Sequence, residues 1–193
     1  MLLYITSNQN KIDTANKRLE PFGIKLEGLK VEGLIEPQSE DIIEISQSKA
    51  KQAFKKVKKP LIVSDSGWVI PTLNGFPGPY MAYVNRWLTS QDFLNLMKDK
   101  ENKDIILREC VTYIDKNQIQ SFTYDTKGSF VEEESGESTP LDQVITFRDD
   151  KKTVAKCINE GEIGIPQNEL WNEVGEWLNR NMNSLNKSIS NRK

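Results

Sequence analysis

The segment Leu61-Ile62-Val63-Ser64-Asp65-Ser66-Gly67-Trp68 decides how the rest of this 193-residue sequence is interpreted. Its three leading apolar residues predict a buried strand at 61–64, and Asp65 follows at the end of that strand. Ser66 and Gly67 then predict a turn of the chain. A carboxylate held rigidly at a strand end can face a cleft, where it can bind a metal or accept a proton. The alternative is an aspartate that only begins a turn.

The loop that follows favours a functional role for Asp65. It reads Leu73-Asn74-Gly75-Phe76-Pro77-Gly78-Pro79-Tyr80, with two glycines and two prolines around the phenylalanine. Proline fixes φ and glycine permits turns that other residues make only with strain, so this loop follows a tight, defined path. A plain surface connection does not need such a loop.

Composition excludes several classes of protein. Hydrophobic residues make up 37% of the sequence, charged residues 28%, and the net charge is −2. This weakly acidic balance argues against bulk binding of nucleic acid. No apolar run approaches the ~20 residues that cross a bilayer, and the first residues lack the basic part of a signal peptide. The two cysteines form no metal-binding pattern. We therefore expect a cytoplasmic protein with no nucleic-acid or membrane partner.

The sequence contains no histidine. This absence removes Ser-His-Asp and Cys-His catalysis, histidine general bases and histidine-bound zinc. Any chemistry must therefore use carboxylates, lysines, hydroxyls and a hard cation such as Mg²⁺.

The hydrophobic periodicity predicts an α/β fold with a mixed sheet, because a βαβαβ pattern precedes a β-rich half and a closing helix. Strands are expected at 2–5, 24–31, 61–64, 105–114, 118–124, 129–131 and 144–147. Helices are expected at 11–19, 41–57, 80–88, 90–100 and 169–178. Turns are expected at 115–117 and 126–128.

The last predicted helix has one apolar face, made by Leu170, Trp171, Val174, Trp177 and Leu178. Residues 1–178 are expected to form a single domain. Residues 179–193 are mostly Asn, Ser, Lys and Arg, and we expect them to form a disordered polar tail.

Two further segments carry polar groups at the starts of predicted helices. Thr6, Ser7 and Asn8 precede the first helix, where free backbone N–H groups attract anions, and Lys11 adds a positive charge. The alternative for this segment is an ordinary helix cap followed by a solvated lysine. A loop containing Glu36 leads into the long helix at 41–57.

That long helix carries a run of lysines between Lys49 and Lys59. Most of this run is interpreted as a solvated helix face. A nucleic-acid patch is not supported, because the interleaved Phe54 belongs to the apolar stripe of the helix.

Taken together, these motifs resemble those of the inosine triphosphate pyrophosphatase family, whose members hydrolyse deaminated purine nucleoside triphosphates. Five segments match in the family's order and approximate spacing: Thr6-Ser7-Asn8 with Lys11, Leu34-Ile35-Glu36, Glu44-Ile45-Ser46 with Lys49-Ala50, Asp65-Ser66-Gly67, and Leu73 to Tyr80. The resemblance covers the first half of the chain well and the second half thinly. It implies a long, twisted mixed sheet flanked by helices, two lobes around a central cleft, and a homodimer.

The resemblance also implies roles for individual residues. Mg²⁺ would be held by Glu36 and Asp65, and Asp65 would also take the proton of the attacking water. Water would attack the α-phosphorus and release pyrophosphate, leaving a nucleoside monophosphate. The residues implied in substrate binding are Thr6, Ser7, Asn8, Lys11, Lys49, Ser66, Gly67 and Asp142.

The sequence departs from the family at the metal site and, more strongly, in the half that binds the base. The family has two adjacent acids where this chain has Ser64 and Asp65. In the segment 139–142, Asp142 keeps its place while the family's two aromatic residues are absent. The family's Ser-His-Arg motif aligns with 166–168, and an expected lysine aligns with Glu162.

Gln167 and Asn168 could form hydrogen bonds with a base edge, or they could cap the last helix. Three functions stay open from the sequence. The leading hypothesis is a Mg²⁺-dependent pyrophosphatase for deaminated or modified nucleoside triphosphates, serving the nucleotide pool. The others are a pyrophosphatase with a different or relaxed base preference and a catalytically silent nucleotide-binding protein.

Overall fold

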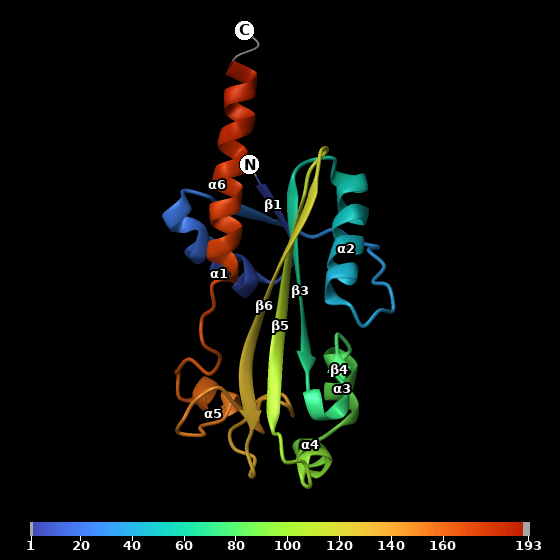
Figure 1. Cartoon of the computed structure of the whole chain (residues 1–193), viewed down its shortest axis with the longest axis vertical. Helices are drawn as coiled ribbons and strands as arrows, with labels where there is room; N and C mark the ends of the chain where they lie inside the picture. Colours follow the sequence, from blue (N-terminus) through green and yellow to red (C-terminus); the bar gives the residue numbers. More distant parts are fainter. Residues whose placement is uncertain (1, 191–193) are drawn as a thin grey trace.

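The protein is built around one mixed β-sheet, seen edge-on along the vertical axis of Figure 1. The computed structural model describes residues 2–190, with side chains described for residues 2–181. The strands are β1 (Leu2–Ile5), β2 (Leu26–Leu29), β3 (Leu61–Val69), β4 (Pro77–Gly78), β5 (Asp104–Ile114), β6 (Ile119–Phe130) and β7 (Ile145–Thr146). The helices are α1 (Gln9–Leu19), α2 (Ile42–Val57), α3 (Met81–Trp87), α4 (Ser90–Met97), α5 (Val154–Asn159) and α6 (Leu170–Ser190).

The strand order β2-β1-β3-β5-β6-β7 makes the sheet mixed, with β4 paired to β3 outside this path. β1 pairs in parallel with β2 and β3, whereas β3, β5, β6 and β7 pair in antiparallel fashion. The predicted fold class, a mixed sheet flanked by helices, is confirmed.

Helices cover both faces of the sheet where it contains β1. α1 and α6 lie on one face, and α2 lies on the other (Figure 1). Successive side chains of a strand point to opposite faces, so Ile62 packs with α1 and α6 while Leu61 and Val63 pack against α2. On α2, Ala50 and Ala53 are fully buried, and their small side chains let the helix approach β3 closely.

A second group of helices lies at the other end of the long strands. α3, α4 and α5 surround the far ends of β3, β5 and β6 (Figure 1). A separate apolar cluster there includes Ile70, Phe93, Ile105, Phe130 and Val144. The two ends therefore have their own cores and share the three strands that run between them.

The predicted turn at Ser66 and Gly67 is wrong. β3 continues through both residues to Val69, because β5 pairs with it along its whole length. Gly67 serves a close approach instead: a Cβ atom there would lie 3.1 Å from the backbone of Gly78 in β4. Asp65 consequently lies inside a strand, just beyond the point where the neighbouring β1 ends.

The predicted turn at 126–128 is also wrong, and the two strands expected on either side of it are the single strand β6. Gly128 again marks a close approach rather than a turn. A Cβ atom at this position would lie 2.6 Å from the carbonyl oxygen of Thr146 in β7. The contact joins segments that are distant in sequence, so a local pattern cannot distinguish it from a turn.

The helices agree with the predicted ones except at two places. α5 was not expected, because six residues are too few for a periodic pattern; Thr153 caps it by accepting a hydrogen bond from Lys156 N. α6 continues past Leu178, the predicted end, to Ser190. The division into a domain at 1–178 and a tail at 179–193 stays a prediction, and 191–193 lie outside the described residues. In the part of the chain that the structure describes, no helix is long and apolar enough to span a membrane.

Replacing Gly128 with alanine should destabilise the fold. The added methyl group would meet the backbone of β7, and overpacking of this kind costs about 1–3 kcal/mol. Urea unfolding of Gly128→Ala measures this loss. Lys127→Ala, an exposed change on the same strand, is the matched control and should stay within about 0.5 kcal/mol of the parent. Equal stability of the two variants would contradict the close approach.

Candidate active site

Three of the predicted site residues meet at one point. The Nζ atom of Lys49 lies 2.6 Å from Oδ1 of Asp65 and 2.9 Å from Oε1 of Glu36. The side chains of Lys49 and Asp65 are 18% and 15% exposed, whereas that of Glu36 is 61% exposed. Lys49 and Asp65 therefore form the mostly buried part of the cluster, and Glu36 reaches solvent.

The position of Lys49 follows from the packing of α2. Asp41 caps the helix by accepting a hydrogen bond from Ile43 N at 2.8 Å. Ala50 faces the sheet, so the preceding residue, Lys49, lies at the border of the buried helix face and can reach Asp65 on β3.

The loop that carries Glu36 is fastened to the same helix. The side chain of Gln52 accepts a hydrogen bond from Ile35 N at 2.9 Å and donates one to Ile35 O at 2.6 Å. Lys56 donates to the carbonyl oxygens of Glu32 and Gly33. Lys56 is thus an exception in a lysine run that was interpreted as a solvated face.

Burial and charge act against each other in this cluster. Burial raises the pKa of Asp65 above its usual value, although the neighbouring Lys49 ammonium opposes the rise. Burial would lower the pKa of Lys49, but the carboxylates of Asp65 and Glu36 outweigh it, so the pKa of Lys49 is raised. The geometry therefore favours a lysine that stays charged between two carboxylates.

The donor set fits a hard divalent cation. Oδ2 of Asp65 is buried and has no hydrogen-bond partner among the described residues, an arrangement that costs free energy unless a ligand satisfies it. Glu36 and Asp65 already converge on one positive charge. Among the side chains described for residues 2–181, no three or more His, Cys, Asp or Glu residues form a metal cluster. A cation here would complete its shell with water and phosphate oxygens, as Mg²⁺ commonly does.

The predicted phosphate-binding segment forms the N-terminal cap of α1. Asn8 Oδ1 accepts a hydrogen bond from Lys11 N at 3.3 Å, and Thr6 Oγ1 accepts one from Asn8 N at 3.1 Å. Asn8 therefore caps α1, as the alternative for this segment expected. The segment follows β1, and its Lys11 lines one cavity together with Asp65.

That cavity has a volume of about 220 Å³ and lies beside the Lys49 cluster. Its walls include Tyr4, Ser64 and Ser66 on the strands. Ser64 takes the place of the family's first acid, and its hydroxyl forms a hydrogen bond with Tyr4 Oη. Burial raises the pKa of Tyr4 to about 12, so this wall is a neutral hydroxyl pair.

Two further residues of the cavity were not found by sequence reasoning. Glu109 lies on β5 opposite Ser66, and Trp171 lies in the first turn of α6. Trp171 was assigned only to an apolar helix face. Glu109 gave no local signal, because the pairing of β3 with β5 is what brings it to the cavity.

The residues aligned with the base-binding half of the family have other partners. Asn168 Oδ1 accepts a hydrogen bond from Leu170 N, so this residue caps α6, and its Nδ2 donates to Glu109 Oε2. Glu162 forms ion pairs with Lys152 and Arg148. The carboxylate of Asp142 accepts a hydrogen bond from Ser138 and does not line the cavity. A substrate-binding role for Asp142 stays a prediction.

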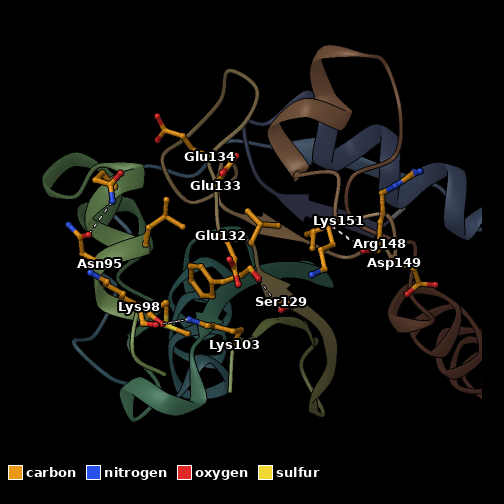
Figure 2. A pocket seen from close by; sticks show the side chains of 16 residues that line it. Asn95, Lys98, Lys103, Ser129, Glu132, Glu133, Glu134, Arg148, Asp149 and Lys151 are labelled. Atoms are coloured by element: carbon orange, nitrogen blue, oxygen red, sulfur yellow. Dashed lines mark hydrogen bonds between the residues drawn. The ribbon is translucent and has the colours of Figure 1, made fainter. Parts of the chain in front are cut away.

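A larger cavity lies elsewhere and contains none of the predicted site residues. Its volume is about 880 Å³, and Figure 2 shows it beside α4 and the segments around β7. Its lining contains the acidic Glu132 and Glu133 as well as the basic Lys98, Lys103 and Lys151. Mixed charges of this kind do not form an anion site, so the smaller cavity is the better candidate.

The comparisons with known proteins agree with the fold and the motifs. The sequence model of the Ham1 family matches residues 2–163, and the chain belongs to this family. The resemblance to inosine triphosphate pyrophosphatases is thereby confirmed.

Relatives named dITP/XTP pyrophosphatase are similar to this chain. The protein from Thermococcus kodakarensis is 28% identical over 183 residues, which cover 94% of this chain and 98% of the relative. That from Saccharolobus solfataricus is 32% identical over 153 residues, covering 79% of each chain.

Solved structures of Ham1 proteins share the fold. The Ham1 protein of Staphylococcus aureus has a TM-score of 0.72 at 19% identity and covers 92% of this chain and 97% of its own. A HAM1 protein from Coxiella burnetii has a TM-score of 0.74 at 16% identity, covering 95% and 98%.

If Glu36 and Asp65 hold a divalent cation, replacing Gln52 with alanine should weaken its binding. The change frees the backbone of Ile35 and so loosens Glu36, while Lys49 and Asp65 keep their direct contact. Loss of such hydrogen bonds should raise the Mg²⁺ concentration for the half-maximal increase in melting temperature by about 2- to 10-fold. Lys51→Ala, an exposed change on the same helix, should have the parent's Mg²⁺ response. A Gln52→Ala response equal to that of Lys51→Ala would show that the loop is held by other contacts.

Proposed function

We propose that this protein hydrolyses nucleoside triphosphates to nucleoside monophosphates and pyrophosphate in a Mg²⁺-dependent reaction. The observation that carries the proposal is the contact of Lys49 with both Glu36 and Asp65, next to a cavity that Lys11 also lines. Two cations and two carboxylates at one site suit a polyphosphate bound together with a divalent cation.

The names of the relatives support a substrate of the deaminated purine type. Proteins called dITP/XTP pyrophosphatases align with nearly the whole chain, at 28% identity in the Thermococcus protein. We propose the same class of substrate here, and a role in clearing deaminated or modified nucleotides from the nucleotide pool. We place this role in the cytoplasm, with which two buried free cysteines agree, and propose a homodimer on the resemblance alone.

The residues of the site would share the work of the reaction. A Mg²⁺ ion held by Glu36 and Asp65 would neutralise phosphate charge and make a bound water more acidic. Lys11 and Lys49 bind and orient the triphosphate, and they stabilise the charge that builds up on its oxygens. Backbone N–H groups at the start of α1 offer further donors to the phosphates.

Asp65 is the group that takes the proton. Water attacks the α-phosphorus, the bond between this phosphorus and the bridging oxygen breaks, and pyrophosphate leaves. The proton of the water passes to Asp65, whose Oδ2 has no hydrogen-bond partner among the described residues. The buried position of Asp65 keeps this oxygen away from bulk water.

Asp65→Asn should abolish most of the activity while preserving the fold. The two side chains are nearly isosteric, but the amide cannot accept the proton, so turnover should fall by at least ~10²-fold. Pyrophosphate release from a panel of nucleotides with Mg²⁺ measures this loss, and chelation of Mg²⁺ should stop the reaction of the parent protein. Asp13→Asn, on the exposed side of α1, is the control. Near-parental activity of Asp65→Asn would remove Asp65 from the mechanism.

Lys11→Ala and Lys49→Ala should impair all nucleotides to the same degree, because phosphates carry no information about the base. Either kcat should fall or KM should rise by a common factor for each base tested. Lys49→Ala also leaves two carboxylates without their cation, so its melting temperature is measured in parallel. The exposed Lys55 and Lys59 are the control positions. A defect of Lys11→Ala confined to one base would contradict the assignment.

A further inference from the structure

The 220 Å³ cavity is lined by two side chains that the phosphate and metal chemistry does not use, Glu109 and Trp171. Pockets that enclose a whole drug-sized ligand have about 300–1,000 Å³, so this one has room for only part of a nucleotide. Lys11 and Asp65 also line it, and the phosphates would lie beside them. A base attached to those phosphates would enter the cavity beside Glu109 and Trp171.

A hydrogen bond to one of its two carboxylate oxygens holds Glu109 in place. Its Oε2 accepts a hydrogen bond from Asn168 Nδ2, and Asn168 is itself fixed by its contacts with Thr126 and the start of α6. Among the side chains described for residues 2–181, Oε1 of Glu109 has no hydrogen-bond partner, and no lysine or arginine forms an ion pair with it. The cavity therefore contains a positioned acceptor that the protein leaves available.

Trp171 provides an aromatic wall of the same cavity. Its ring is partly exposed and contacts Tyr4 edge-on, with ring centroids 5.7 Å apart and an interplanar angle of 70°. This contact fixes the ring. Stacking of a base on an aromatic ring contributes about 1–3 kcal/mol and does not depend on which base is stacked. Trp171 can therefore bind a base, and Glu109 can distinguish one base from another.

An acceptor distinguishes purines by the state of N1. In hypoxanthine, xanthine and guanine, which have a carbonyl at C6, N1 carries a hydrogen that a carboxylate can accept. In adenine, N1 carries a lone pair, which a carboxylate repels. Enzymes read the Watson–Crick edge of a base in this way when it lies in a side-chain pocket. A carboxylate thus selects the same bases as a cationic donor to the C6 oxygen, but through the neighbouring atom.

We propose that Glu109 is the specificity-determining residue of this protein, and that it selects 6-oxopurine nucleotides by accepting the N1 hydrogen of a base stacked on Trp171. This inference rests on the proposed function for the position of the phosphates. It accounts for the absence of histidine and of the family's Ser-His-Arg motif. Hydrogen bonds to charged groups correspond to about 10- to 100-fold in binding, so a preference of this size for inosine over adenosine triphosphate is expected.

The test is the ratio of kcat/KM for inosine triphosphate to that for adenosine triphosphate in Glu109→Gln. Glutamine is nearly isosteric and its oxygen can still accept the hydrogen bond from Asn168, while its amide can donate to N1 of adenine. Activity with inosine triphosphate should fall and activity with adenosine triphosphate should rise, so that the ratio drops by about 10-fold or more. A merely structural role of Glu109 would lower both activities together. An unchanged ratio would overturn the inference.

Three further variants complete the kinetic experiment. Asn168→Asp keeps the cap of α6 but loses the Nδ2 donor, and it should displace Glu109 and lower the ratio as well. Trp171→Leu should lower kcat/KM for both nucleotides by the same factor. Glu27→Gln, an exposed change on β2, is the matched control and should leave the ratio unaltered.

A binding arm separates this inference from the proposed function. Calorimetry with inosine and adenosine monophosphates gives their dissociation constants in the parent protein and in Glu109→Gln, with no need for hydrolysis. If the parent protein releases no pyrophosphate from any nucleotide, the proposed function fails, and the binding ratio still decides the role of Glu109. Tighter binding of the inosine nucleotide that is lost in Glu109→Gln supports the inference. Equal binding of both nucleotides, or no binding, overturns it.

Discussion

The candidate site depends on one buried ammonium group. Lys49 contacts two carboxylates, of which Asp65 is mostly buried, and an ionised carboxylate in that position is tolerable only beside a positive charge. The helix that presents Lys49 is in turn positioned by Ala50 and Ala53 against β3. The chemistry of the site is therefore set by the packing of two small residues, one next to Lys49 and one a helical turn away from it.

The same helix also determines where the loop acid lies. Gln52 and Lys56 hold the backbone that leads to Glu36, so one helix carries both the cation and the support for one of its anions. The site is formed by β3, α2 and the loop that carries Glu36. Because this loop is bound to α2, the position of the site depends on only two elements, β3 and α2. These contacts explain how Glu36 keeps a defined position although its side chain is largely exposed.

Sequence reasoning found what depends on local pattern. The motif around Asp65, the loop acid Glu36 and the lysine on the long helix were all predicted, and the structure brings them together. The sequence did not reveal contacts between distant strands. Gly67 and Gly128, which allow two backbones to approach closely, were therefore interpreted as parts of turns. Glu109 was missed for the same reason, since only the register of β5 against β3 carries it to the cavity.

The continuity of β3, β5 and β6 has a mechanical consequence. These strands run without interruption from the helices around Lys49 to the group formed by α3, α4 and α5 (Figure 1). A hinge needs a few residues whose dihedral angles can change freely, and paired strands do not supply them. Rotation of one end against the other would have to bend or twist the sheet itself. Substrate should therefore enter through movement of loops around a stiff sheet, and not through a hinge motion between the two ends of the molecule.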